Sequence, residues 1–230
     1  MEHLLLHLSS LTPDTMSRIY FLCCFLMLLS CREDSIKSEK IIWPQDTIIV
    51  SGSQDDSPKA IPQIKTREDI KSEHSYISEM AESGNLISTS FKYNCNEEKK
   101  GELKYFFENN KLRLIKHTYN EYSHFSATDE YYIKDGSVFF VFLNHVSWNF
   151  TEHNQTRDNI TESRIYILEN KAVRCLEKKY SVHSNDKNPP ESNEIPNKEI
   201  ECNAVEATFK DFEMLYKLRE QKEDMGCLEE

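Results

Sequence analysis

The chain has 230 residues, of which 29% are charged and 38% apolar, and its formal net charge is −11. These proportions suit one domain of ordinary size that carries long polar segments. Because an acidic protein repels phosphate backbones and no basic patch offsets this charge, nucleic acid is not an expected partner. The five glycines are too few for glycine-rich phosphate loops.

The first 30 residues contain the pattern of an export signal. Counting from Met16, Arg18 supplies a positive charge, and eleven apolar residues follow from Ile19 to Leu29. An apolar stretch of about 7–15 residues is typical of a cleaved secretory signal, whereas a membrane-spanning helix needs about 20 residues. We therefore expect residues 16–30 to be a signal peptide, and residues 1–15 to be untranslated or non-structural.

The sequence LLSC at residues 28–31 ends this apolar stretch and resembles the lipobox of bacterial lipoproteins. In that family the cysteine thiol receives a diacylglycerol, and the peptide bond before the cysteine is cut. The resemblance implies cleavage between Ser30 and Cys31 and lipid attachment at Cys31, which makes residues 16–30 a lipoprotein signal peptide. The alternative is a buried helix that ends at Cys31, which the length and flanks of the segment disfavour.

The charged residues directly after Cys31, in the sequence CREDS, resemble a short tag that exports some Bacteroidota-type lipoproteins to the outer face of the outer membrane. Solvated charge after a lipid anchor would look the same. The expected location is therefore the outer membrane, lipid-anchored, on either the periplasmic or the cell-surface side.

The remaining chain divides into a tether, one domain and a tail. Residues 31–65 are polar and contain three prolines, as expected of a tether between anchor and domain. Within it, residues 41–50 form an apolar island that we expect to dock as an edge strand. Residues 66–222 are predicted to be a single α+β domain, and residues 223–230 a polar tail.

Two helices are predicted at the ends of this domain. The first runs from about Arg67 to Ser83, because Thr66 can cap it and apolar residues recur at helical spacing. The second runs from about Ala204 to Gln221 with one apolar face. The apolar positions are Ile70, His74, Ile77 and Ala81 in the first helix and Val205, Phe209, Phe212, Leu215 and Leu218 in the second.

Three similar segments between these helices predict repeated β-hairpins. They are KYFFENNKLRLI (104–115), EYYIKDGSVFFV (130–141) and RIYILENKAVRC (164–175). Each carries strand-forming residues on both sides of a two-residue turn, where Asn, Asp and Gly tolerate left-handed backbone angles. The predicted turns are Asn109–Asn110, Asp135–Gly136 and Asn170–Lys171.

The turns also predict which residues face each other across each hairpin. Ile133 should lie opposite Val138, and Tyr131 opposite Phe140. Residues 138–143, VFFVFL, are apolar throughout, which is typical of a central strand covered on both faces. With residues 85–94 as a further strand, we expect an antiparallel meander sheet of about six or seven strands, flanked by an N-terminal and a C-terminal helix, with polar loops at 149–163 and 181–201.

This layout of acylated cysteine, helix, tyrosine-rich hairpins and helix resembles a group of uncharacterised Bacteroidota-type lipoproteins. Their hairpins read roughly E-Y-Y-F-x-N-G-K-L, and here DEYYIKDGSVFFVF and ESRIYILENKAVRCL carry the likeness, over about residues 67–220. The turn lysine of that pattern is replaced by Ser137 and Ala172. The resemblance implies architecture and export only, because no activity is attached to that group.

Four cysteines follow the anchor, and an exported protein can oxidise them. Cys95, Cys175 and Cys202 are the candidate disulfide partners, with three pairings open if all four cysteines take part. Cys227 lies in a polar tail and is expected to be free, and Cys175 could equally be a small apolar core residue.

Side chains suited to catalysis or metal binding are scattered. His117, His124, His145 and His153 fall near hairpin ends with Asp129 and Glu130, but no H-x-H or i, i+4 spacing brings them together. Asn149, Asn154 and Asn159 each begin an N-x-S/T triplet, which in a bacterial lipoprotein is more simply chance than a glycosylation signal. We predict no catalytic residue, metal or cofactor.

The sequence therefore indicates a membrane-anchored lipoprotein whose domain is a non-enzymatic binding or interaction module. Its expected partners are the lipid bilayer, through acylated Cys31, and an unidentified protein or glycan. The alternative is an envelope enzyme, or a carbohydrate-processing accessory protein, with a site assembled from scattered residues.

Overall fold

The computed structural model describes residues 63–152, 155–203 and 205–228. The lipobox, the predicted cleavage site and the apolar island at 41–50 lie outside these residues. The described elements are α2 (Arg67–Glu82), β1 (Ile87–Cys95), β2 (Lys99–Glu108), β3 (Lys111–Glu121), β4 (Phe125–Lys134), β5 (Ser137–Phe150), β6 (Thr156–Leu168), β7 (Lys171–His183), η2 (Ser192–Glu194), β8 (Lys198–Ile200), α3 (Val205–Lys217) and η3 (Leu218–Glu220).

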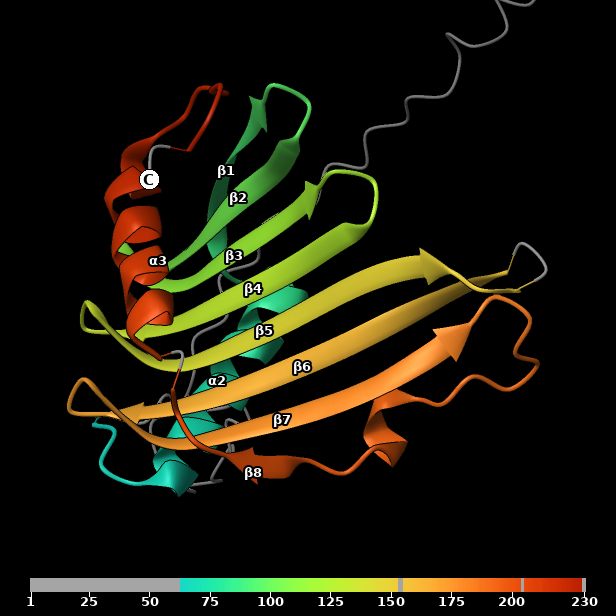
Figure 1. Cartoon of the computed structure of the whole chain (residues 1–230). Coiled ribbons are helices and arrows are strands. Elements are labelled where there is room, and N and C mark those ends of the chain that lie inside the picture. Colours follow the sequence, from blue (N-terminus) through green and yellow to red (C-terminus); the bar gives the residue numbers. More distant parts are fainter. Residues whose placement is uncertain (1–62, 153–154, 204, 229–230) are drawn as a thin grey trace, which may run out of the picture. The chain divides into compact units, whose positions relative to one another are not determined.

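The strands form one antiparallel meander in which each pairs with the next along the chain (Figure 1). This confirms the α+β class and the meander, but the described residues form eight strands, not six or seven. The short strand β8 was missed because it is three exposed residues, KEI, within a polar loop. It pairs with Cys175, Leu176 and Glu177 of β7.

Strands extend into both predicted loops. β5 continues to Phe150 and β6 starts at Thr156, so most of residues 149–163 are strand, at the end of a long hairpin. The loop predicted at 181–201 likewise begins only after β7 ends at His183. Figure 1 shows why the sequence concealed these extensions, since β5, β6 and β7 continue well beyond both helices. With no helix above or below, neither strand face needs an apolar pattern.

The three predicted hairpins are confirmed, and they share one irregularity. The turns are Asn109–Asn110, Asp135–Gly136 and Glu169–Asn170, all with positive φ angles. The third turn therefore lies one residue before the predicted Asn170–Lys171. Three residues after each turn, one residue is extra in the returning strand and forms a β-bulge. The extra residues are Arg113, Phe139 and Val173.

The bulge explains the errors in predicted register. Ile133 does lie opposite Val138, but beyond the bulge the pairing shifts by one residue. Phe140 therefore lies opposite Tyr132, and Tyr131 opposite Val141. The same shift places two consecutive side chains of β5, Phe139 and Phe140, in the apolar cluster beneath α2.

The helix α2 packs on one face of the sheet. Its capping box joins the side chain of Thr66 to the backbone N–H of Asp69, and that of Asp69 to the N–H of Thr66. Ile70 and Ile77 are fully buried, as the apolar stripe predicts. They belong to a cluster with Leu86, Phe106, Leu114, Tyr132, Phe139, Phe140, Tyr166 and Leu176.

The helix α3 packs on a second apolar cluster, formed by strand residues that alternate with those under α2. Phe212 and Leu215 of α3 are buried in it, and Val205, Phe209 and Leu218 are partly buried, so the predicted apolar face is confirmed. The hydroxyl of Tyr105 on β2 donates a hydrogen bond to the carbonyl of Leu215 at 2.9 Å. The strand residues of the cluster are Phe91, Leu103, Tyr105, Leu112, Ile115, Tyr131, Ile133, Val138, Val141, Ile165, Ile167 and Cys175.

Two disulfides hold the segments on either side of α3 to the sheet. Cys202, shortly before α3, is bonded to Cys175 on β7. Cys227, after α3, is bonded to Cys95 on β1. The expectation that Cys227 is free was wrong, because the tail returns to the β1 edge, where Met225 forms a parallel bridge with Tyr93.

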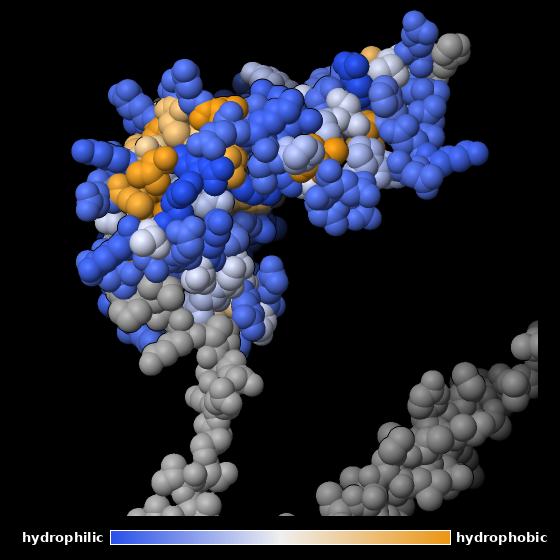
Figure 2. All heavy atoms as spheres, turned by 90° about the horizontal axis from the view of Figure 1, so that it is seen from below, coloured by the Kyte–Doolittle hydropathy of each residue, from blue (hydrophilic) through white to orange (hydrophobic). Residues whose placement is uncertain are grey.

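The surface seen from below in Figure 2 is mostly hydrophilic, with apolar side chains gathered mainly in a patch at the upper left. Large exposed apolar side chains are few within the described part of the chain. They are Ile87, Tyr122, Phe150, Val173 and Ile200.

Candidate functional site

The face of the sheet that carries α2 has two adjoining hollows, which together form a groove beside the helix. Their volumes are about 370 and 570 Å³. Both hollows are lined by Ser78, Glu82, Glu130 and Tyr132, so they form one groove over β2 to β6. The other lining residues are Ala81, Glu102, Lys104, Phe106, Leu114, Lys116 and Thr118 on one side and Ile70, Lys71, His74, Ser75, Phe140, Phe142, Arg164 and Tyr166 on the other.

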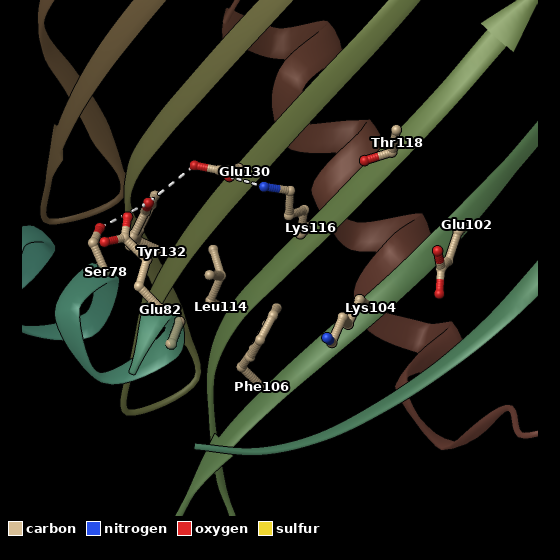
Figure 3. A pocket seen from close by; sticks show the side chains of 11 residues that line it. Ser78, Glu82, Glu102, Lys104, Phe106, Leu114, Lys116, Thr118, Glu130 and Tyr132 are labelled. Carbon is tan, nitrogen blue, oxygen red and sulfur yellow. Dashed lines mark hydrogen bonds and ion pairs between the residues drawn. The ribbon is translucent and has the colours of Figure 1, made fainter. Parts of the chain in front are cut away.

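A chain of polar contacts crosses the middle of this groove, as Figure 3 shows. The Tyr132 hydroxyl donates a hydrogen bond to Oε2 of Glu130 at 3.0 Å, and the Ser78 hydroxyl lies 3.1 Å from the Tyr132 hydroxyl. The Lys116 ammonium lies 2.9 Å from Oε1 of Glu130. Burial, followed by the charge of Glu130, raises the pKa of Tyr132 well above its ordinary value. Tyr132 therefore stays a neutral donor at physiological pH.

Cationic side chains cover aromatic rings on both sides of these contacts. Lys104 Nζ lies 5.0 Å from the centre of the Phe106 ring, and the Arg164 guanidinium lies 4.8 Å from that of Phe142. Lys104 and Lys116 are direct cross-strand neighbours on β2 and β3, an arrangement of like charges that is unfavourable unless acceptors lie nearby. The groove therefore offers fixed donors, fixed acceptors and apolar ring edges.

His74 of α2 lines the groove, but its ring packs against aromatic side chains of the sheet. Its ring centre lies 4.5 Å from that of Tyr132 and 4.8 Å from that of Phe140. Burial lowers the pKa of His74, and this effect outweighs the opposing charge of Glu130. His74 is thus a half-buried neutral side chain.

A separate cavity of about 440 Å³ lies between α3 and the sheet. The Tyr93 hydroxyl and His117 Nε2 are 2.9 Å apart, and the rings of His117 and Tyr119 stack at 4.4 Å. Outside the cavity, His145 Nε2 lies 2.9 Å from Oδ1 of Asp129. The cavity is lined by Tyr93, Cys95, Lys99, His117, Tyr119, Asp129, Tyr131, Lys210, Asp211, Met214, Leu215 and Leu228.

Burial controls the protonation of these groups. It lowers the pKa of His117 to about 3, with the charge of Lys99 acting in the same direction. Burial and the charge of Asp129 raise the pKa of Asp211. Gly101 leaves room for Tyr93, because a Cβ there would lie 2.9 Å from the Tyr93 ring and 2.5 Å from the Thr118 carbonyl oxygen.

Comparison with known proteins finds no relative. No protein-family model, no curated protein and no solved structure matches the chain. The geometry and the sequence are therefore the grounds on which a function is proposed below.

The structure brings together some of the scattered residues that the sequence offered as candidates. His117, Asp129 and His145 lie close together on the α3 face, whereas Glu130 points to the groove on the opposite face. His124 packs against Trp148 with ring centres 4.2 Å apart. Among the described residues, no three His, Cys, Asp or Glu side chains are grouped to hold a metal ion.

The other candidate positions either lie outside the described residues or belong to the N-x-S/T triplets. Ser30, Cys31, His153 and Asn154 lie outside the described residues. Asn159 Nδ2 donates to Oδ1 of Asn149 at 3.1 Å, so the two flanking N-x-S/T triplets face each other on paired strands. No helix of the described chain is long and apolar enough to cross a membrane.

The groove was missed from the sequence, because its residues come from α2 and five different strands. One signal was available. Lys104, Lys116 and Glu130 stand at or just beyond the ends of the predicted hairpin segments and prove to be mid-strand in β2, β3 and β4, on the face that carries Phe106, Leu114 and Tyr132. Charge at mid-strand positions of an otherwise apolar face indicates where the covering helix ends.

Proposed function

We propose that this protein is an exported, membrane-anchored lipoprotein that is cut after Ser30 and acylated on Cys31. The signal pattern and the lipobox support this location. The pairing of all four remaining cysteines in two disulfides also supports it, because such bonds persist in oxidising compartments and are rare in the cytosol. The expected site is the outer membrane, on its periplasmic or cell-surface side.

The domain on this anchor is a non-enzymatic binding module, and its contact surface is the groove beside α2. The observation that carries this proposal is the preformed contact chain of Ser78, Tyr132, Glu130 and Lys116 across the floor of the groove. Groups already held by one another bind a ligand without an ordering cost. An open groove over five strands about 4.8 Å apart accommodates an extended chain rather than a compact molecule.

The ligand class that this surface fits is a linear glycan. Neutral and charged hydrogen-bonding groups both line the groove, as hydroxyl-rich sugars require, together with the rings of Phe106 and Phe142. A purely acidic or basic polymer would meet charges of its own sign, because Glu82 and Glu102 line the groove with Lys104 and Arg164.

Affinity electrophoresis tests this proposal with dextran, xylan, chondroitin sulfate and alginate cast separately into native gels. We expect dextran or xylan, the two neutral polymers, to retard the protein, and the acidic chondroitin sulfate and alginate to leave its migration unchanged. Thr118 is exposed in the groove, and Thr118→Arg should abolish the retardation. Ser147→Arg, on the opposite face, should preserve it. Absence of retardation by both neutral polymers, retardation by the acidic polymers alone, or equal effects of both variants would refute the glycan-binding groove.

The enzyme alternative has one observation in its favour, the group of His117, Tyr93, Asp129 and His145 at the cavity under α3. A histidine held by a carboxylate, as His145 is by Asp129, can act as a general base. If this site acted on a glycan, His145→Gln would stop product formation while leaving gel retardation intact. The binding module predicts no cleavage of a retained polysaccharide by the unmodified protein.

A further inference from the structure

The strand β1 lies at one edge of the sheet, and the C-terminal tail pairs with only half of it. The Asn94 N–H donates to the carbonyls of Met225 and Gly226 at 3.2 and 2.9 Å, and the Met225 N–H donates to the carbonyl of Lys92 at 3.0 Å. The Lys92 N–H donates to Oδ1 of Asp224 at 2.8 Å. Lys92 and Asn94 therefore direct their backbone groups away from β2.

Backbone direction alternates along a strand, and the register of β1 with β2 is unbroken from Ile87 to Cys95. Ser88 and Ser90 consequently direct their N–H and C=O groups outward as well. Within the described chain, no hydrogen bond reaches these outward groups. Two N–H donors and two C=O acceptors thus stand in a row on the exposed half of the edge.

Within the described residues, this half of the edge lacks the usual protection against strand pairing. Natural sheets protect edges with charged residues, proline, bulges or a covering segment. Residues 84–91 contain neither charge nor proline in a chain that is 29% charged, and β1 has no bulge. Ile87 is 68% exposed here, although it lies on the same strand face as the buried Phe91.

We propose that a second copy of this chain occupies the edge, with the two β1 strands antiparallel about a two-fold axis at Thr89. In this register Ser88 lies opposite the partner's Ser90, so the outward groups of each copy meet those of the other in hydrogen-bonded pairs. Ile87 then lies beside the partner's Phe91. The two strands are complementary, because the two outward residues lie at equal distances on either side of Thr89. The N–H and C=O groups of each copy then meet the C=O and N–H groups of the other, as a two-fold interface requires.

The pairing involves five residues of each copy, since the tail and the Cys95–Cys227 bond occupy the rest of the edge. Such a contact is smaller than a standard stable interface. The dimer is therefore reversible and depends on concentration. Confinement to a membrane surface would favour it, but the pairing itself does not depend on the anchor or on the groove.

Cysteine cross-linking in the cells that produce the protein tests the register. Thr89 would lie opposite the partner's Thr89 in a non-hydrogen-bonded pair, with Cα atoms about 4.5 Å apart, within disulfide range. We expect Thr89→Cys to give a dimer on non-reducing gels that reductant removes. Ser88→Cys is the matched control. The introduced cysteine side chains of the two copies would lie diagonally across the strand pair, about 7–8 Å apart, which is too far for a disulfide.

A second substitution tests the edge itself in the Thr89→Cys background. Ile87→Lys should abolish the cross-linked dimer through charge at the interface, and the same change at Val173, which is 48% exposed on β7, should leave it intact. No cross-link from Thr89→Cys, or equal cross-linking from Ser88→Cys, would refute the paired strands. A cross-link from Thr89→Cys to a different protein would replace the second copy with a peptide partner and equally overturn the proposal.

Discussion

The guanidinium of Arg113 on β3 donates a hydrogen bond to the fully buried carboxylate of Glu73 in α2. Arg113 is the extra residue of the first bulge, which directs its side chain toward the helix. Lys134 on β4 lies 2.9 Å from the other carboxylate oxygen of Glu73. This buried triad joins α2 to the first two hairpins near their turns.

Removing the carboxylate should be strongly destabilising. Glu73→Leu removes the carboxylate that Arg113 and Lys134 share and leaves Arg113 only its longer contact with Glu108 at 3.6 Å. Breaking a buried pair in this way costs about 3–5 kcal/mol. Urea unfolding measures the loss, and Glu79→Leu on the exposed side of α2 is the matched control, with a change within about 0.5 kcal/mol. A small effect of Glu73→Leu would mean that α2 is held by its apolar residues alone.

Truncation of Phe140 tests the core beneath α2. Phe140→Ala should cost about 3–5 kcal/mol, because the ring is 5% exposed and contacts both Tyr132 and Tyr166. Phe150→Ala, at a ring that is 65% exposed on the same strand, should change the melting temperature little. Similar melting temperatures for both variants would show that the central strand does not carry the core.

The disulfides predict a specific peptide map. Proteolysis without reduction should release one peptide pair joined through Cys95 and Cys227 and another joined through Cys175 and Cys202, as mass spectrometry identifies. The double variant Cys175→Ser/Cys202→Ser should lose about 2–5 kcal/mol of stability. A free thiol at Cys227 in the exported protein would contradict the arrangement of the tail on β1.

The burial of His117 predicts a loss of stability in mild acid. Its pKa is about 3 when folded, against an ordinary 6.5, so the unfolded chain binds a proton that the folded chain does not. The stability is therefore complete above pH 6.5 and falls as the pH drops toward 3, by about 1.4 kcal/mol per pH unit at the steepest. The groups facing His117 are Lys99, Tyr93, Tyr119 and Asp129.

Unfolding by urea at a series of pH values measures this dependence. His117→Gln should flatten the curve between pH 6.5 and about 5, where most carboxylates remain ionised. His124→Gln, at an exposed position, should leave the slope unchanged. An identical slope in all three proteins would place the acid sensitivity elsewhere.

The lipid anchor predicts the fate of a single substitution. Cys31→Ser should leave the precursor uncut and remove the protein from the stable membrane fraction, because two acyl chains anchor firmly where one is marginal. Mass spectrometry of the mature protein with Cys31 intact should find no peptide from residues 1–30. An unchanged mass and unchanged fractionation of Cys31→Ser would refute the anchor.

The sequence by itself determined the two helices, the three hairpins and the central position of β5. Thr66 and the apolar spacing of Ile70 and Ile77 define α2 locally, and the turn residues Asn109 and Asp135 define their hairpins through left-handed backbone angles. These features depend on residues within a few positions of one another, so they can be read along the chain.

Only the tertiary structure decided the bulges, the cysteine pairing and the groove. The extra residue after each turn is permitted by the local sequence, but its side chain is fixed by what lies above it, as with Arg113 under Glu73. Cys227 meets Cys95, 132 positions away, because α3 crosses the sheet and returns the tail to β1. The groove exists because α2 is too short to cover its face of the sheet, and the length of a helix relative to the strands beneath it is a property of the packed domain.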